Sequence, residues 1–213
     1  MQKTEGLIAA PFTPMNKNLD VMEARIPEYY DFLEKNGIKG AFINGSTGEG
    51  VSLSQRERMN ITKQWTQCAK DKKNLKIINL VGGTSYIECI NEAKFSAETG
   101  VDAIAVLAPF YFKPSGASQL VDFVGRVAAA VPELPVFFYH IPVLTGCYAP
   151  MYDFLKLADT TIPNLAGIKY THEDFMDFQS CVNFMEGKYD MLWGRDENLL
   201  SALAVGARGG VGS

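Results

Sequence analysis

Apolar runs and amphipathic stretches alternate along this chain. Short runs that are almost continuously apolar recur roughly every 30 residues, and each is followed by a stretch whose apolar residues return at helical spacing. Continuous apolarity is typical of parallel strands that are covered on both faces. The runs that predict strands are 7–10, 40–43, 77–81, 102–107, 135–139, 165–171, 190–193 and 207–213.

The stretches between these runs carry helix signals. Two capping boxes predict helix starts at Ser54 and Ser85, each with a glutamate three residues later. Pro27 fits the first turn of another helix that begins near Ile26, and Gly100 fits a helix end. The residues expected on the buried sides of three helices are Met59, Thr62, Trp65 and Ala69; Ile90, Ala93 and Ala97; and Phe175, Phe178, Val182 and Met185.

Strand and helix alternate often enough to define an architecture. The pattern predicts a single domain over residues 1–213 with the α/β architecture of a (β/α)8 barrel, or TIM barrel, in which the eighth strand is the last element. A doubly wound open sheet is the competing architecture. Eight strands without an obvious dinucleotide-binding fingerprint favour the barrel. In a barrel, the loops that follow the strands meet at one mouth and form the active-site face.

Composition and charge narrow the classes of function. The 213 residues are 47% hydrophobic with a formal net charge of −4, which is typical of a globular protein with a substantial core and gives no sign of nucleic-acid binding. Residues 1–6 lack the basic region and apolar run of a secretion signal, and the longest apolar runs are too short to span a membrane. We therefore expect a cytoplasmic protein without a nucleic-acid or membrane partner.

Residues that bind metals or form disulfides are sparse and scattered. Their spacing matches neither a zinc site nor a redox motif, so we expect reduced cysteines and no metal. The cysteines and histidines are Cys68, Cys89, Cys147, Cys181, His140 and His172.

A lysine stands at the carboxyl end of the apolar run 165–171. If this run is a buried strand, Lys169 emerges at the barrel mouth, where desolvation favours the neutral amine that can attack a carbonyl carbon. The alternative is a lysine that has cleared the sheet and reached solvent, which is the usual place for this residue type.

Other polar residues follow the strands and would converge on the same mouth. They are Ser46, Thr47, Tyr111, Tyr139, Thr171, Asp196, Glu197 and Ser213. A lysine, a phenol and a glycine-flanked Ser-Thr pair form a coherent set for Schiff-base chemistry on a 2-oxo acid. The phenol would move a proton, while the hydroxyls and backbone N–H groups of the pair would hold a carboxylate.

Each of these signals has another interpretation. The segment 45–50 is also a plausible glycine-rich turn, although it is no nucleotide-binding loop because no Gly-Lys-Ser/Thr follows. Tyr139 could be a core aromatic, and Asp196 with Glu197 could simply face a helix dipole. The segment 209–213 could bind phosphate, but only Arg208 accompanies it as a basic residue.

Four motifs, taken in order, carry a resemblance that spans essentially the whole chain. They are Gly45-Ser46-Thr47-Gly48-Glu49, Tyr139-His140-Ile141-Pro142, Gly167-Ile168-Lys169 and Gly209-Gly210-Val211-Gly212-Ser213. Together they resemble the N-acetylneuraminate lyase and dihydrodipicolinate synthase superfamily of class I aldolases. Within it, 139–146 and 194–197 are similar to signatures of the animal-type N-acetylneuraminate lyases. Leu144 stands where the synthases usually carry an arginine, which argues against the synthase activity.

The resemblance implies a carbon–carbon lyase that reversibly cleaves N-acetylneuraminate, a sialic acid, to N-acetylmannosamine and pyruvate. It implies that Lys169 forms the Schiff base and Tyr139 donates and accepts the proton, with no cofactor beyond the lysine. Ser46 and Thr47 would bind the pyruvyl carboxylate, with Thr47 also linked to Tyr139. The residues implied to bind the hydroxyl-rich tail of the sugar are Thr171, Gly194, Asp196, Glu197 and Ser213. Tyr111 matches a tyrosine at the subunit interface of relatives and is assigned only a supporting role.

The end of the chain departs from this family. Family members continue past the Gly212-Ser213 position with an eighth barrel helix and a helical extension, and they form tetramers. An eighth strand without its covering helix would leave apolar surface exposed to water, at a free-energy cost of about 25 cal/mol for each Å². Three hypotheses therefore remain: a sialic acid aldolase that is homotetrameric at full length, a lyase or synthase for another 2-oxo acid, and a catalytically silent truncated fragment.

Overall fold

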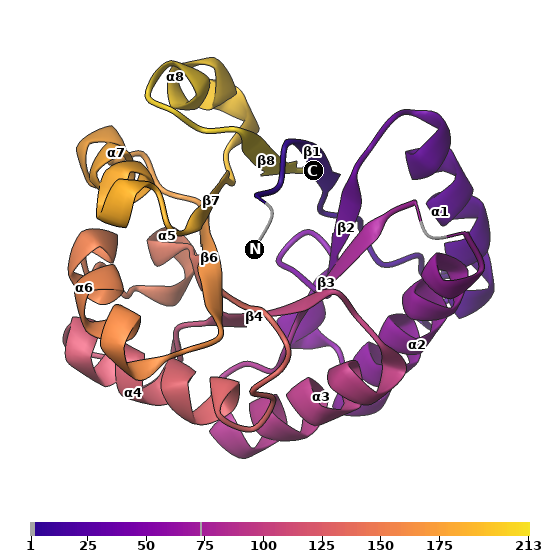
Figure 1. The fold of residues 1–213 in the computed structure, drawn as a ribbon. Helices are drawn as coiled ribbons and strands as arrows, with labels where there is room; N and C mark the ends of the chain where they lie inside the picture. The colour runs from indigo at the N-terminus through magenta and orange to yellow at the C-terminus, as the bar shows by residue number, and fades with distance from the viewer. Residues whose placement is uncertain (1–2, 73) are drawn as a thin grey trace.

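The computed structural model describes residues 3–72 and 74–213, and its strands form one closed parallel barrel in chain order (Figure 1). The strands are β1 (Gly6–Ala9), β2 (Gly40–Ile43), β3 (Lys76–Leu80), β4 (Ala103–Leu107), β5 (Val136–His140), β6 (Leu165–Tyr170), β7 (Asp190–Trp193) and β8 (Gly209–Gly212). β8 pairs with β1 over four residues, which closes the ring. The barrel is confirmed and the open sheet is excluded. The expectation for residues 1–6 falls partly on Met1 and Gln2, which lie outside the described residues.

Helices follow the strands and cover most of the outside of the barrel (Figure 1). They are α1 (Ile26–Lys35), α2 (Gln55–Lys72), α3 (Tyr86–Thr99), α4 (Ala117–Ala128), α5 (Pro142–Thr145), α6 (Met151–Thr161), α7 (Phe175–Asn183) and α8 (Leu199–Ala204), with 3-10 turns η1 (Glu23–Arg25), η2 (Gly50–Ser52), η3 (Phe184–Glu186) and η4 (Asp196–Asn198). The helix starts predicted at Ser54 and Ser85 are confirmed. The N–H of Ser54 donates to Glu57 at 2.8 Å, and the hydroxyl of Ser85 accepts the N–H of Glu88 at 3.4 Å.

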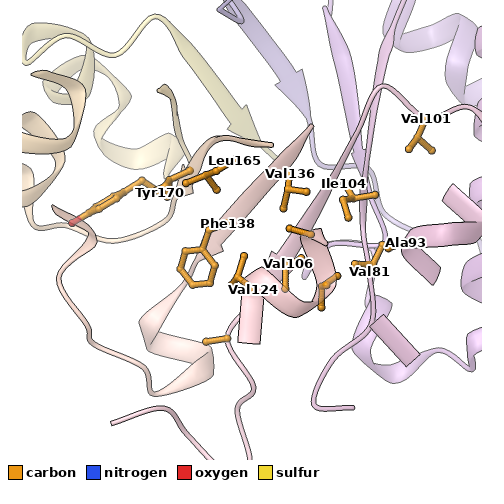
Figure 2. Packing of buried hydrophobic residues seen from close by; sticks show 14 of the residues in the cluster. Val81, Ala93, Val101, Ile104, Val106, Val124, Val136, Phe138, Leu165 and Tyr170 are labelled. Atoms are coloured by element: carbon orange, nitrogen blue, oxygen red, sulfur yellow. The ribbon is translucent and has the colours of Figure 1, made fainter. Parts of the chain in front are cut away.

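Two apolar cores lie on the two sides of the strands. One fills the barrel and includes Ile8, Phe42 and Leu192, whereas the other lies between the sheet and the helices (Figure 2). Neighbouring residues of a strand point to opposite faces. On β5, Phe138 therefore packs outward while Tyr139 points into the barrel.

A β-bulge in β6 decides which way Lys169 points. β5 pairs Val136 with Leu165 but the next residue, Phe137, with Gly167, so β6 has one extra residue here. Leu165 packs outward, and strict alternation would turn Lys169 outward as well. The extra residue reverses the alternation and directs Lys169 into the barrel. Gly167 is required at this point because a Cβ there would lie 1.8 Å from the carbonyl oxygen of Asp190 on β7.

The buried stripes of three helices differ from the predicted ones. On α2 and α3 the buried set includes polar residues, among them Arg58, Glu92 and Ser96, while the predicted Ala97 is exposed. On α7 the fully buried residues are Phe178 and Cys181, and the predicted Met185 is exposed beyond the helix end. Of the predicted residues, Thr62, Trp65, Ala93 and Phe178 are buried as expected. The apolar spacing did not show that polar residues would complete the stripes of α2 and α3.

The outer face of the barrel is open beside β8 and β1. The ring of helices leaves these two strands uncovered in Figure 1, and Leu7 on β1 is 50% exposed. Among the described residues, no helix is both long and apolar enough to cross a membrane. All four cysteines are free and buried.

Candidate active site

Lys169 lies inside the barrel mouth against two aromatic rings. Its amine lies 4.0 Å from the ring centroid of Phe42 and 4.2 Å from that of Tyr139. The residue is only 3% exposed, and burial lowers the pKa of the amine to about 7, with the negative charge of Asp196 opposing the shift. This environment excludes the solvent-exposed alternative and supplies a neutral amine near neutral pH.

The phenol of Tyr139 lies one strand away, on β5. Its hydroxyl is 3.3 Å from the hydroxyl of Ser46, and its ring packs edge-on against Phe42 with centroids 5.3 Å apart. Burial raises the pKa of Tyr139, while the nearby hydroxyls of Ser46 and Thr171 act in the opposite direction. Tyr139 is therefore a neutral phenol at neutral pH. Its hydroxyl faces the mouth, which distinguishes it from an ordinary core aromatic.

The glycine-rich loop after β2 presents Ser46 and Thr47 at the mouth. The backbone around this pair is unusual because Asn44 and Glu49, which are not glycines, both have φ of +56°. The loop folds back so closely that a Cβ on Gly50 would lie 1.9 Å from the carbonyl oxygen of Asn44. Backbone strain of this kind is concentrated at functional sites.

Thr47 has a different partner from the one that the resemblance implies. Its hydroxyl is 2.8 Å from the hydroxyl of Ser213, and the neighbour of Tyr139 is Ser46 instead. The predicted link between Thr47 and Tyr139 is therefore wrong in this structure. β2 and β8 are separated in the barrel by β1 alone, so the two loops that carry Thr47 and Ser213 can meet directly across the end of β1.

Asp196 and Ser213 lie together on the β7 and β8 side of the mouth. The N–H of Ser213 donates to the carboxylate of Asp196 at 3.0 Å. That carboxylate packs directly on the backbone of β8, since a Cβ on Gly212 would lie 2.2 Å from its Oδ1. A carboxylate held in this way still offers free lone pairs to a hydroxyl-rich ligand.

Thr171 and Gly194 make close contact where β6 and β7 end. A Cβ on Gly194 would lie 1.9 Å from the hydroxyl oxygen of Thr171. This oxygen is buried near the hydroxyl of Tyr139, whose pKa it lowers. Thr171 therefore presents a hydroxyl at the mouth beside the phenol.

Glu197 is exposed and belongs to a small charged group at the rim. Arg195 lies 3.1 Å from the carboxylate of Glu173 and 3.8 Å from that of Glu197. Asp196 and Glu197 also occupy the first turn of η4, where negative charge suits the helix dipole. The sequence did not predict that Glu197 would have charged neighbours. The position of Arg195 within the 194–197 motif was the one feature of the sequence that could have indicated them.

Tyr111 lies apart from the other predicted residues. It is 76% exposed in the loop between β4 and α4, and its ring packs edge-on against Phe112 at 5.0 Å. Among the described residues, no hydrogen bond joins it to Lys169, Tyr139 or Ser46.

The structure also places near the site several residues that were not predicted from the sequence. Phe42 forms the apolar surface under the amine of Lys169, and it follows Ala41 in a run that predicted only a strand. Asn44 anchors the start of the glycine-rich loop through its amide, which donates to Asn79 at 2.7 Å. Behind the loop lies a buried ion pair between Arg58 and Glu92. The sequence carries no local signal for it, because Arg58 follows Glu57 and Glu92 follows Asn91, as charged residues on a solvated helix face would.

The arrangement as a whole suits amine chemistry on a carbonyl group. A desolvated amine, a neutral phenol and a glycine-rich loop that presents the hydroxyls of Ser46 and Thr47 meet at one end of the barrel. Within residues 3–72 and 74–213, no three His, Cys, Asp or Glu side chains gather in a way that could hold a metal ion.

Comparison with known proteins places the chain in a family. The Dihydrodipicolinate synthetase family matches residues 3–213, and the chain belongs to this family. N-acetylneuraminate lyase A of Xenopus laevis is 42% identical over 213 residues, an alignment that covers all of this chain and 69% of the relative. The human N-acetylneuraminate lyase is 43% identical over 214 residues, covering 100% and 67%.

Solved structures show the same likeness. The N-acetylneuraminate lyase of Proteus mirabilis has a TM-score of 0.96 and 34% identity, covering 100% of this chain and 71% of that one. The sialic acid aldolase of Aliivibrio salmonicida also has a TM-score of 0.96, at 36% identity and coverages of 100% and 70%.

Proposed function

We propose that this protein is an N-acetylneuraminate lyase, which reversibly cleaves N-acetylneuraminate to N-acetylmannosamine and pyruvate through a Schiff base. The observation that carries the proposal is the buried amine of Lys169, whose pKa is lowered to about 7 inside a barrel mouth. The substrate class is supported by the similarity to lyases of this name over the full chain.

The first step forms a covalent bond to the substrate. The neutral amine of Lys169 attacks the ketone carbon of the 2-oxo acid, and loss of water leaves a protonated imine. Because burial lowers the pKa of the amine to about 7, the neutral form is available near neutral pH. The lysine itself therefore supplies the electron sink.

The second step breaks or forms the carbon–carbon bond, with Tyr139 as the proton carrier. In the condensing direction, the enamine of pyruvate attacks the aldehyde carbon, and the phenol donates its proton to the oxygen that becomes a hydroxyl. In the cleaving direction the phenolate takes the same proton back, and the bonding electron pair moves into the imine to give the enamine. A raised pKa keeps Tyr139 protonated and ready to donate. After cleavage, the enamine takes a proton at its terminal carbon, which the phenol of Tyr139 supplies from the proton it has just accepted. Water then hydrolyses the resulting imine, which releases pyruvate and frees the lysine.

The remaining residues hold the substrate. Ser46 and Thr47, with the backbone N–H groups beside them, bind the carboxylate in this proposal. The residues assigned to the hydroxyl-rich tail are Thr171, Gly194, Asp196, Glu197 and Ser213. The contact between Thr47 and Ser213 at 2.8 Å places the two groups side by side at the end of β1, so that one ligand could reach both.

The proposal also covers the oligomeric state of the protein and its place in the cell. Residues 1–213 belong to one catalytic domain of a cytoplasmic homotetramer, with Tyr111 in a supporting role at a contact between subunits. The exposed pair of Tyr111 and Phe112, 76% and 85% exposed, supports such a contact because large exposed aromatics favour protein interfaces.

Trapping with borohydride tests the central step. We expect incubation with pyruvate and reduction to add one pyruvyl group to the peptide that contains Lys169. The Lys169→Ala variant is the matched control and should gain no mass. A folded wild-type protein without an adduct would contradict the Schiff base.

The aldehyde partner tests the substrate. N-acetylmannosamine should support condensation with pyruvate and yield N-acetylneuraminate. An adduct on Lys169 combined with condensation only on another aldehyde would instead indicate a different pyruvate-dependent aldolase. Leu144, in α5, favours the lyase because the synthases that this chain resembles usually carry an arginine at this position.

A further inference from the structure

A buried ion pair joins α2 and α3 behind the glycine-rich loop. The Nε of Arg58 on α2 donates to both carboxylate oxygens of Glu92 on α3, at 3.0 and 3.1 Å. Their side chains are 7% and 2% exposed. Two buried charges are unusual between a sheet and its helices, where apolar packing is the rule.

Each member of the pair also holds a loop that opens toward the mouth. The Nη1 of Arg58 donates to the carbonyl oxygens of Gly50 and Leu53, at 3.2 and 2.6 Å. Glu92 accepts the N–H of Gly82, in the loop after β3, at 2.9 Å. The pair therefore connects the loop after β2 to the loop after β3.

The segment that Arg58 holds is continuous with the Ser-Thr pair. The N–H of Gly50 donates to the carbonyl of Gly45 at 3.1 Å, and the N–H of Glu49 donates to the carbonyl of Ser46 at 3.0 Å. Gly50 also packs tightly on the backbone of Asn44, where even a Cβ would find no room. A movement at Gly50 is thus passed directly to Ser46 and Thr47.

We propose that Arg58 and Glu92 are positioning residues that fix Ser46 and Thr47 in the pose that binds the carboxylate of the 2-oxo acid. The inference rests on the proposed function, which assigns carboxylate binding to this loop. Neither residue touches the substrate. Their function is to satisfy the carbonyl groups of an irregular segment that lacks a regular hydrogen-bond ladder of its own.

A double substitution tests the inference without leaving a buried charge unpaired. In Arg58→Met with Glu92→Gln, the amide oxygen at position 92 still accepts the N–H of Gly82, but the carbonyls of Gly50 and Leu53 lose their donor. We expect the pyruvate concentration that gives half-maximal borohydride trapping to rise about tenfold, with maximal trapping at Lys169 unchanged. In Arg58→Lys, which keeps a charge opposite Glu92, the rise should be smaller.

The matched control removes an ion pair at the opposite end of the barrel. Lys188 and Asp159 form such a pair just before β7 begins. Lys188→Met with Asp159→Asn removes both charges and keeps an oxygen to accept the hydroxyl of Tyr189. This control should leave the half-saturating pyruvate concentration unchanged.

Hydrogen exchange separates this inference from the proposed function. Amide exchange in 44–53 should become faster in the double variant, Arg58→Met with Glu92→Gln, and stay unchanged in the control. Unchanged exchange in 44–53 together with unchanged half-saturation would overturn the positioning role. A wild-type protein that traps no pyruvate would contradict the proposed function, and the exchange measurement would then decide the inference alone.

Discussion

Two sides of the barrel are built from different chemistry. Between β2–β3 and the helices α2–α3, side-chain hydrogen bonds run from Asn44 to Asn79 at 2.7 Å and from Asn79 to Ser96 at 2.9 Å. The same side holds the ion pair of Arg58 and Glu92. We call this the polar side.

The opposite side, between β5–β7 and the helices α6–α7, is packed with aromatic rings. Phe138 lies 4.9 Å from Phe154, and Trp193 lies 4.8 Å from Phe178 and stacks on Tyr170 at 5.9 Å. We call this the aromatic side. It carries Lys169 on β6, a regular strand apart from its bulge.

The difference follows from what each side has to hold. A strand satisfies its own backbone through the sheet, so apolar packing is enough to hold β5 and β6 and the side chains of Tyr139 and Lys169. The loop with Ser46 and Thr47 has no such ladder, and directional hydrogen bonds from Asn44 and Arg58 replace it. Apolar contacts fix where an element lies, whereas buried polar contacts fix the conformation of an irregular one.

Breaking one member of the polar pair should have the largest effect. Arg58→Met alone leaves the carboxylate of Glu92 buried without its partner, which costs about 3–5 kcal/mol of the free energy of unfolding. Denaturation in urea measures this loss. The double substitution with Glu92→Gln should recover much of it, and equal losses in the two variants would contradict the importance of the unpaired charge.

Phe154→Ala provides the comparison on the aromatic side. Phe154 is fully buried, and its truncation should cost about 3–5 kcal/mol, a similar amount, through the cavity it leaves. Half-saturating pyruvate should nevertheless stay close to the wild-type value. If both variants weakened pyruvate binding equally, the distinction between the two sides would be lost.

Removing the unpartnered amine should stabilise the protein in a pH-dependent way. Lys169 has no carboxylate within ion-pair distance among the described residues, and its pKa falls from 10.5 to about 7 on folding. Below pH 7 both states are protonated, and the folded state bears the full cost of a buried charge. Lys169→Met should therefore raise the free energy of unfolding by roughly 2–4 kcal/mol at pH 6 to 7.

The stability gained by Lys169→Met over the wild-type protein should shrink as the pH rises. Between about 7 and 10.5 the unfolded chain keeps its proton while the folded chain loses it, so the wild-type protein gains stability with increasing pH. Urea denaturation of both proteins from pH 6 to 9.5 measures the difference. A constant difference over this range would show that the amine is not desolvated.

The helix caps should give the smallest effects, one on each side. Ser54→Ala removes the cap of α2 on the polar side, and Asp174→Ala removes the cap of α7 on the aromatic side, where Asp174 accepts the N–H of Asp177 at 3.0 Å. Each loss should be about 1 kcal/mol, measured as a shift of the urea midpoint. Only Ser54→Ala should also speed exchange in 44–53, because it frees the helix start beside Arg58.

The sequence predicted the architecture well because its signals are local. The apolar runs gave all eight strands to within a residue or two at most ends, and the caps at Ser54 and Ser85 depend on residues three positions apart. Lys169 and Tyr139 could be selected because each stands near the carboxyl end of such a run.

The remaining features depend on contacts between distant residues. Arg58 and Glu92 are 34 positions apart, and Thr47 and Ser213 are 166 apart. No periodicity within one helix could show that Arg58 is buried rather than solvated. The bulge at Gly167 likewise depends on the backbone of β7, so the sequence indicated a glycine there without revealing that it turns Lys169 inward.

The pairing of β1 with β8 has a consequence for the order of folding. Gly6 pairs with Gly209, so one edge of β1 has no partner until the seven strands that follow it have been synthesised. Contacts between such distant residues are slow to form. During that interval the unpaired backbone of β1, together with the exposed Leu7, offers an edge to which another nascent chain can add. The eighth strand to emerge from the ribosome is therefore the one that protects the first.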